Sequence, residues 1–233
     1  MNEPNASGPT LLPRGPAALP PDAVARAHRE RLLRAMADAV AEKGYVATSI
    51  ADIVSRARVS RSAFYACFRD KEDCFLAGYA AEADRHFELI TDAVAAQPEW
   101  LDQLTAGAHA YVRQLRLQPR FARTFLVEVI AAGPRATELR AEVHDRYAGL
   151  MKTWYDGAPK SLRLPPLPDE IFRAAVGATN ELVIARLERI LERDAEALEE
   201  AQPLERLVRY TLFAIFGLTD VAGTDEEGSA APG

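Results

Sequence analysis

The chain has 233 residues, enough to bury one large hydrophobic core or two smaller ones. Hydrophobic residues make up 48% of it and the formal net charge is −6, a composition typical of a globular protein. Apolar runs with the two-residue period of strands are absent, so we expect an all-α fold. No apolar run approaches the ~20 residues that cross a bilayer, and the start lacks the basic-then-apolar order of a signal peptide. We therefore expect a cytoplasmic protein that does not bind a membrane.

The charge is unevenly distributed along the chain. Residues 1–69 hold about ten Arg and Lys against about six acidic residues, which leaves the remainder with a net charge of about −10. This asymmetry is typical of a protein that contacts phosphate groups with one end only. Residues 1–21 are rich in Pro, Gly and Ala and are expected to form a disordered arm.

The first helix is expected to begin at Pro21 and Asp22 and to end at Gly44, which suits a left-handed C-terminal position. Residues 48–68 then predict two short helices joined by a tight turn. Thr48 and Ser49 can cap the first of these, and Ser60 can cap the second. Apolar residues recur at offsets of three and four on both helices, at Ile50, Ile53, Val54, Ala57, Phe64 and Phe68. This is the helix-turn-helix pattern that enters a DNA major groove.

The second short helix has side chains suited to DNA contacts on its outer side. Arg61 can reach a guanine edge or a phosphate, Ser62 can bond to either, and Tyr65 can bond a phosphate. Ala63 is small enough for a close approach to the groove. A helix-turn-helix pattern alone also occurs in helical proteins that do not bind DNA, so its specificity is low.

The surrounding motifs make the interpretation more specific. In order, the chain carries Ala-Val-Ala-Glu-Lys-Gly-Tyr (39–45), Thr-Ser-Ile-Ala-Asp-Ile (48–53), Val-Ser-Arg-Ser-Ala-Phe-Tyr-x-x-Phe (59–68) and Lys-Glu (71–72). This ordered run, over roughly residues 25–80, closely resembles the N-terminal domain of TetR-family transcriptional regulators.

The resemblance implies roles for individual residues. Thr48 and Ser49 would contact phosphates, and Lys71 would hold a further phosphate. Contacts from the recognition helix would come from Ser60, Arg61, Ser62 and Tyr65. The chain departs from the family pattern at four positions, with Arg58 for a frequent Gly in the turn, Val54 for Ala, Ser62 for Gly and Cys67 for His. The last two affect which operator sequence is read, and a left-handed Arg58 would cost about 1 kcal/mol.

Beyond Asp70 the pattern predicts a helical body. Helices are expected over residues 70–96, 99–118, 119–132, 137–155, 169–200 and 204–218, with a proline-rich loop over 157–168. The expected total of about nine helices agrees with the number that the family resemblance implies. We divide the chain into an arm (1–21), a DNA-binding domain (22–71), a ligand-binding and dimerisation body (72–221) and a disordered tail (222–233).

Aromatic and polar side chains alternate with aliphatic ones along the body, as in a pocket for an apolar effector. Aromatic residues at helical spacing belong to a core more often than to a pocket, so both readings stay open. The candidate pocket residues are Phe87, Trp100, His109, Tyr111, Phe125, Tyr147, Met151, Trp154 and Asn180.

The last two helices are apolar on more than one side. Burial on two sides predicts a homodimer through a four-helix arrangement, which the resemblance also implies; a central helix inside a monomer is the alternative. The candidate interface residues are Val176, Leu187, Leu207, Leu212 and Phe216. In such a dimer two recognition helices enter successive major grooves, which predicts a near-palindromic operator.

Residue patterns for other chemistry are missing. We find no nucleophile with a base, no carboxylate pair in an apolar setting and no Glu-x-x-His metal spacing, so we expect no catalytic residues, metal or cofactor. Cys67 and Cys74 read as ordinary thiols, with redox sensing as the lesser alternative. The sequence predicts a DNA-binding transcriptional regulator, most simply a repressor released from double-stranded operator DNA by an unidentified small, largely apolar effector. The alternative is a helical protein-interaction module or an enzyme-like bundle.

Overall fold

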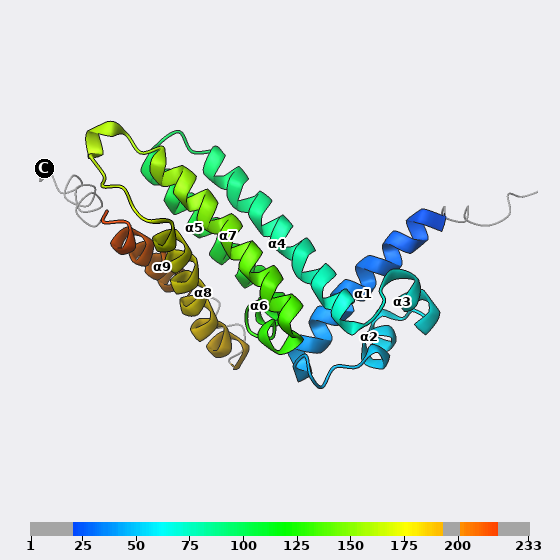
Figure 1. The fold of residues 1–233 in the computed structure, drawn as a ribbon. Coiled ribbons are helices and arrows are strands. Elements are labelled where there is room, and N and C mark those ends of the chain that lie inside the picture. Colours follow the sequence, from blue (N-terminus) through cyan, green and yellow to red (C-terminus); the bar gives the residue numbers. More distant parts are fainter. Residues whose placement is uncertain (1–20, 193–200, 219–233) are drawn as a thin grey trace, which may run out of the picture.

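The computed structural model describes residues 21–192 and 201–218, and within these ranges the chain is all-helical with nine α-helices, as predicted (Figure 1). The arm and tail predicted at the two ends lie outside the described residues, apart from Pro21 at the start of the first helix. The helices are α1 (Pro21–Lys43), α2 (Ile50–Ala57), α3 (Arg61–Cys67), α4 (Lys71–Ala95), α5 (Trp100–Leu117), α6 (Pro119–Leu126), α7 (Pro134–Asp156), α8 (Asp169–Glu192) and α9 (Ala201–Ile215). Short 3₁₀ helices occur at Ile130–Ala132 and Lys160–Leu162.

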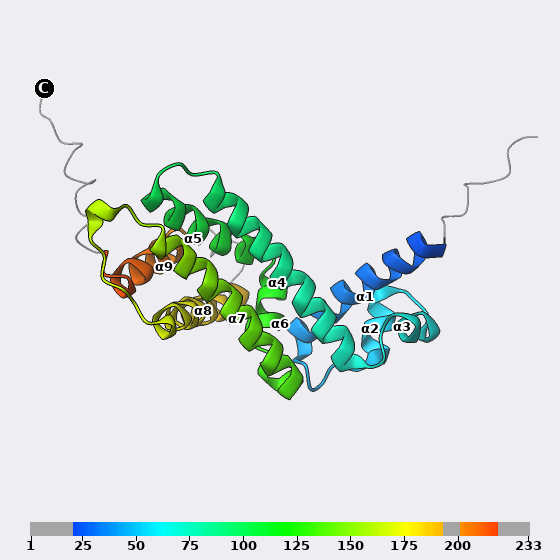
Figure 2. The ribbon, with the colours of Figure 1, turned by 45° about the horizontal axis from the view of Figure 1, so that its top comes forward.

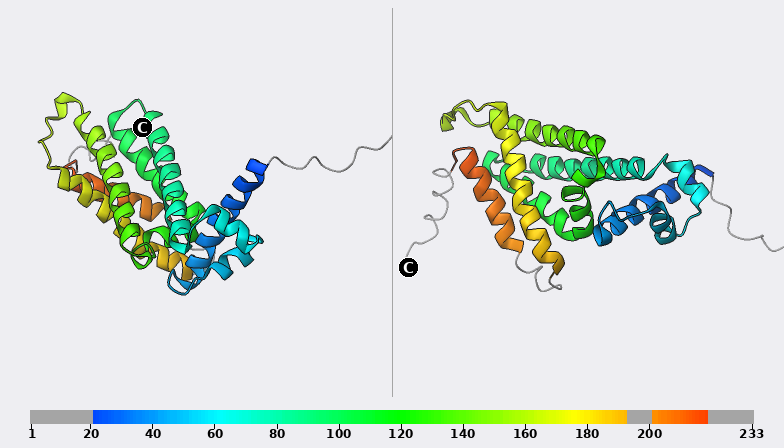
Figure 3. Two further views of the ribbon diagram at one scale, coloured as in Figure 1. Left: turned by 45° about the vertical axis from the view of Figure 1, so that its right-hand side comes forward. Right: turned by 60° about the horizontal axis from the view of Figure 1, so that its bottom comes forward.

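Helices α1–α3 form a head at one end of the molecule, and α4 runs from the head into the helical body (Figures 1 and 2). In the body, α4, α5 and α7 run alongside one another, while α8 and α9 pack together on the outer side (Figure 3). Helix α6 lies where the body meets α1. No helix among residues 21–192 and 201–218 is long and apolar enough to span a membrane.

Most helix ends follow from local sequence. Gly44 has φ +81°, the left-handed conformation expected of a glycine after a helix C-terminus. Ser49, Ser60 and Asp70 each accept a hydrogen bond from a backbone N–H in the first turn of α2, α3 and α4.

The predicted helix over residues 119–132 is shorter in the structure. Helix α6 ends at Leu126 because the backbone N–H of Glu128 donates to the carbonyl of Arg123, five residues back, and the regular pattern breaks. Helix α7 begins at Pro134, three residues before the predicted start, since a proline in the first turn needs no intrahelical N–H partner.

The hydrophobic core of the head continues into the body. Phe64 and Phe75 are fully buried in one cluster with Phe125 and Val129 from the segment around α6. The rings of Phe75 and Phe125 lie 5.4 Å apart between centroids. This cluster therefore crosses the domain boundary predicted between residues 71 and 72.

Two polar contacts also join the head to the segment around α6. The buried Thr124 hydroxyl donates to the carbonyl of Ala37 in α1 at 2.8 Å. The backbone N–H of Tyr45, just after α1, donates to Glu128 Oε2 at 2.8 Å. Both contacts hold the C-terminal half of α1 against the body.

We predict that Thr124→Val lowers the free energy of unfolding by about 1 kcal/mol, because the change keeps the side-chain shape but removes a buried hydrogen bond. Urea denaturation followed by circular dichroism measures the loss. Thr137→Val is the matched control, since the exposed Thr137 hydroxyl bonds the carbonyl of Gly133 within its own helix turn. An equal loss in both variants would contradict a special role for Thr124.

Candidate DNA-binding surface and effector cavity

The turn between α2 and α3 contains a left-handed residue that is not glycine. Arg58 has φ 51° and ψ 47°, a conformation that costs a residue with a Cβ atom roughly 1–2 kcal/mol. Its backbone N–H bonds the end of α2, and the Arg31 guanidinium in α1 donates to the carbonyls of Ala57 and Arg58. The Arg31 side chain therefore caps the C-terminus of α2 and supports the turn.

Helix α3 has one apolar and one polar side, as predicted. Phe64 and Phe68 are buried against α1, α2 and α4, whereas Ser60, Arg61, Ser62 and Tyr65 are exposed. The Tyr65 side chain is 49% exposed, and the Arg61 guanidinium lies 5.9 Å from the centre of its ring. Ala63 is half-buried. The polar side of α3 is therefore open to a partner outside the subunit.

The hydroxyl groups at the two helix starts have partners within the head. Ser60 Oγ accepts from the Ala63 N–H at 3.1 Å and lies 2.9 Å from Ser62 Oγ. Ser49 and Asp52 form a reciprocal capping box at the start of α2. Asp52 also binds Lys43 at 2.6 Å; these hydrogen bonds hold the pKa of its carboxyl far below the ordinary value.

Thr48 and Lys71 lie differently from what the resemblance implied. Thr48 is 2% exposed, and its hydroxyl donates to the carbonyl of Gly44 at 2.8 Å. The Lys71 ammonium donates to the carbonyls of Tyr45 and Thr48 at 2.8 and 2.9 Å and lies 4.1 Å from the centre of the Tyr45 ring. Burial lowers the pKa of Lys71. Both side chains hold the turn before α2, so the Thr48 hydroxyl is not available to a phosphate in this conformation.

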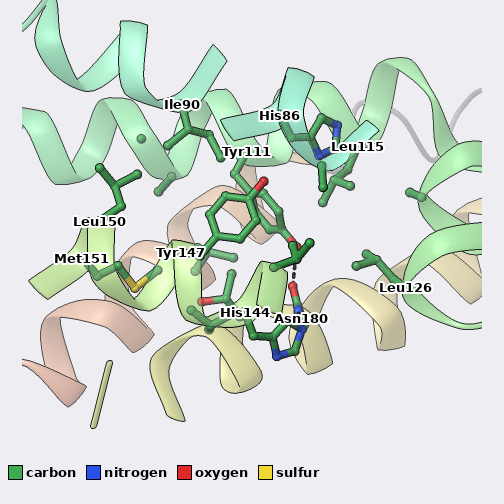
Figure 4. Close-up of a pocket in the computed structure, with 18 of the residues that line it drawn as sticks. His86, Ile90, Tyr111, Leu115, Leu126, His144, Tyr147, Leu150, Met151 and Asn180 are labelled. Carbon is green, nitrogen blue, oxygen red and sulfur yellow. Dashed lines mark hydrogen bonds between the residues drawn. The ribbon is translucent and has the colours of Figure 1, made fainter. Parts of the chain in front are cut away.

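A cavity of about 130 Å³ lies in the body between α4, α5, α6, α7, α8 and α9 (Figure 4). Aliphatic and aromatic side chains make up most of its wall. Six of the predicted pocket residues line it, namely Tyr111, Phe125, Tyr147, Met151, Trp154 and Asn180. Polar residues that the sequence analysis did not single out also line it, among them Glu82, His86 and His144.

Three predicted pocket residues do not line the cavity. Phe87 packs against the Tyr147 ring at 5.7 Å, with the Arg146 guanidinium 4.7 Å from its own ring centre. Trp100 stacks on Trp154 at 4.3 Å, and each indole N–H donates to the backbone carbonyl of the other residue. The exposed His109 pairs with Glu205 at 2.8 Å. Each of these side chains is held outside the cavity wall by another partner.

A chain of hydrogen bonds crosses one side of the cavity from α5 to α8 and α7 (Figure 4). The Tyr111 hydroxyl donates to Asn180 Oδ1 at 2.6 Å, and Asn180 Nδ2 donates to His144 Nε2 at 2.9 Å. Burial lowers the pKa of His144 to about 4, so its imidazole is neutral at neutral pH and can accept this bond. Burial also raises the pKa of Tyr111, which keeps its hydroxyl protonated.

The candidate interface residues divide between the interior and the surface. Val176, Leu212 and Phe216 are 4%, 2% and 1% exposed because they pack in the core of the body, which corrects their assignment to an interface. Leu207 is 47% exposed on α9. The side chain of Leu187 lies outside the described residues.

Metal-binding chemistry has no support in the described parts of the chain, where no group of three His, Cys, Asp or Glu side chains is placed to hold an ion. Cys67 is half-buried, and Cys74 is fully buried. Burial raises the pKa of Cys74 to about 12, which leaves its thiol unreactive.

A capped helix-turn-helix with an exposed polar recognition face, attached to a helical body with an internal cavity, defines a DNA-binding regulator. Residues 32–77 match the family model described as "Bacterial regulatory proteins, tetR family". The head accordingly contains a DNA-binding domain of the TetR family, a family of DNA-binding regulators rather than of enzymes.

Solved structures share the fold over most of the chain. The fatty acid degradation regulator FadR from Bacillus halodurans is similar with a TM-score of 0.66 and 17% identity, over 77% of this chain and 97% of that one. The regulator FadR from Bacillus subtilis was solved in complex with stearoyl-CoA. It is similar with a TM-score of 0.66 and 15% identity, over 77% of this chain and 96% of that one. A TetR-family regulator from Marinobacter aquaeolei VT8 is similar with a TM-score of 0.61 and 21% identity, over 82% of this chain and 97% of that one. No curated protein sequence matches the chain.

We predict that Tyr65→Ala weakens DNA binding without changing the free energy of unfolding, because the ring is exposed on the recognition face.

Lys71→Met is expected to weaken DNA binding and to lower the unfolding free energy by roughly 1–3 kcal/mol, since two carbonyls lose a charged donor. Fluorescence anisotropy with operator DNA and urea denaturation measure the two effects. A Lys71→Met protein as stable as the parent would refute the supporting role of this ammonium.

Proposed function

We propose that the protein is a homodimeric repressor that leaves its operator when a small, largely apolar molecule enters the cavity of the body. Such a repressor works in the cytoplasm, where it meets its operator. The observation that carries the proposal is the position of α6. One side of this helix forms part of the cavity wall, and the other side contacts the head.

The two sides of α6 are only a few residues apart. Phe121, Phe125 and Leu126 line the cavity. Thr124 and Glu128, between and just after them, bind the backbone of Ala37 and Tyr45 at the end of α1. A ligand that pushes α6 outward therefore acts directly on the contacts that orient α1.

Phe125 gives the cavity a second route to the head. Its ring lies 5.4 Å from Phe75 and 5.6 Å from Tyr79, both on α4, and a Cβ atom added at Gly78 would stand 3.2 Å from it. Because packed interiors leave little free volume, a ligand that pushes Phe125 away from the cavity presses it against α4. Helix α4 carries Lys71, which holds the turn before α2.

The outer face of α8 and α9 supports the homodimer. Gly177 on α8 has no atom of the described residues within 4 Å of the place a Cβ would take, which leaves room for a neighbouring helix. On α9, Leu207 and Tyr210 are 47% and 49% exposed. A two-fold axis through this face would present two α3 helices to successive major grooves, about 34–36 Å apart.

A fold relative supports the type of effector. The similar FadR from Bacillus subtilis was solved with stearoyl-CoA, a molecule with a long apolar part. The cavity wall here is likewise mostly aliphatic and aromatic. An apolar ligand in this cavity would change the separation of the two heads, and simultaneous binding of both half-sites would be lost.

We predict that genomic DNA fragments selected by the purified protein contain a near-palindrome with half-sites about one helical turn apart.

Arg61→Ala should weaken binding and reduce the slope of log affinity against log salt by about one if Arg61 contacts a phosphate. Arg113→Ala, an exposed change on α5, is the control. Selected fragments without sequence preference would contradict a repressor. Effector control would be contradicted if no apolar compound in a thermal-shift library dissociates the protein from its DNA.

We predict that Leu207→Asp converts the dimer to a folded monomer, because the charge would be buried at the interface. Size-exclusion chromatography with light scattering measures the mass, and circular dichroism checks the fold. Leu117→Asp, an equally apolar residue 64% exposed at the end of α5, is the control. A monomeric parent protein at micromolar concentration would rule out the homodimer.

A further inference from the structure

The cavity contains a buried carboxylate with one unpaired oxygen. Glu82 on α4 lines the cavity and is 5% exposed. Its Oε2 atom contacts the Arg85 guanidinium. Its Oε1 atom lies 3.1 Å from His86 Nε2, but the two atoms are not aligned for a hydrogen bond, and neither has another partner.

Glu82 is ionised in this setting. Burial raises the pKa of its carboxyl, but the contacts with His86 and Arg85 outweigh burial and hold the pKa below the ordinary value. Among the residues that line the cavity, Glu82 is the only Asp, Glu, Lys or Arg. The Arg85 side chain is 48% exposed and is not part of the wall. The wall therefore contains one carboxylate, whose Oε2 atom is paired with Arg85 and whose Oε1 atom faces His86.

Two polar groups of the wall, Tyr111 and His144, already use part of their hydrogen-bonding capacity within the protein. The Tyr111 hydroxyl proton is used by Asn180, which leaves an oxygen lone pair on Tyr111. The neutral His144 accepts from Asn180 through Nε2. Figure 4 shows His86, Tyr111 and Tyr147 around one part of the cavity, where aromatic faces can also stabilise a cation. A ligand donor in this part of the wall can therefore meet the Glu82 carboxylate and the Tyr111 oxygen.

We propose that the effector is a small apolar molecule with one protonated amine, which donates an N–H to Glu82 Oε1. The inference rests on the proposed function of the cavity as the effector site. An ammonium carries a positive charge and up to three N–H donors, whereas a hydroxyl is uncharged and has one donor. A carboxylate ligand would meet the like charge of Glu82. The unpaired oxygen thus selects amines over alcohols and alcohols over acids.

Three probes with one phenyl ring test this order, namely 2-phenylethylamine, 2-phenylethanol and phenylacetate. A ring of this size suits the cavity, because a cavity of about 150 Å³ in another protein holds benzene. Isothermal titration calorimetry on the full-length protein gives the three affinities. We expect 2-phenylethylamine to bind at least about tenfold more tightly than phenylacetate, a difference of about 1.4 kcal/mol, with the alcohol between them.

Glu82→Gln should weaken amine binding about tenfold and strengthen phenylacetate binding, since the charge is removed at nearly constant shape. Glu88→Gln, the same change at an exposed position of α4, should alter none of the affinities. The ranking in the parent protein tests the proposal even if Glu82→Gln fails to fold. An amine that does not bind, that binds no better than the alcohol or that binds a folded Glu82→Gln protein equally well overturns the proposal.

A DNA-release assay separates this inference from the proposed function. If 2-phenylethylamine binds through Glu82 but leaves the operator complex intact, the ligand selectivity stands and effector control falls. If only uncharged apolar compounds release DNA, and do so equally from the Glu82→Gln protein, effector control stands and the amine proposal falls.

Discussion

The turn between α1 and α2 is held by contacts from two other parts of the chain, and the orientation of the recognition helix depends on it. Lys71 at the start of α4 binds the carbonyls of Tyr45 and Thr48, while Glu128 after α6 accepts the backbone N–H of Tyr45. The backbone of Tyr45 therefore accepts a hydrogen bond from Lys71 at the start of α4 and donates one to Glu128 in the body. Both the N–H and the carbonyl of Tyr45 are thus paired with a charged side chain, and such hydrogen bonds are stronger than neutral ones.

This arrangement explains how a small head can be rigid and still respond to the body. Helices α2 and α3 have eight and seven residues, too short to be stable alone. They depend on α1, α4 and the cap that Arg31 supplies to the turn. Helices α1 and α4 also contact α6, whose other side forms part of the cavity wall. Stability of the head and sensitivity to the cavity thus come from one set of contacts.

Local chemistry made much of the fold predictable. Caps such as Ser49, Ser60 and Asp70 act within three residues, so the starts of α2, α3 and α4 can be derived from sequence. Arg31 and Glu128 could not be assigned in this way, because their partners lie 26 and 83 residues away. A charged residue on a helix shows no sign in sequence of the carbonyl or N–H that it will meet.

The body was less predictable for a related reason. Apolar periodicity says that a side chain is buried but not against what, so Val176, Leu212 and Phe216 read as interface although they fill the subunit core. The same ambiguity placed Phe87 and Trp100 in the cavity. Glu82 and His86 escaped notice because charged residues on a helix usually face solvent.

The stacked indoles of Trp100 and Trp154 have an optical consequence. The chain contains two tryptophans, and both belong to this one stack, with Trp154 also part of the cavity wall. All of the tryptophan emission, and the tryptophan part of the near-ultraviolet dichroism, therefore originates at a single place beside the cavity. The natural chain carries its own spectroscopic reporter there, without an introduced label.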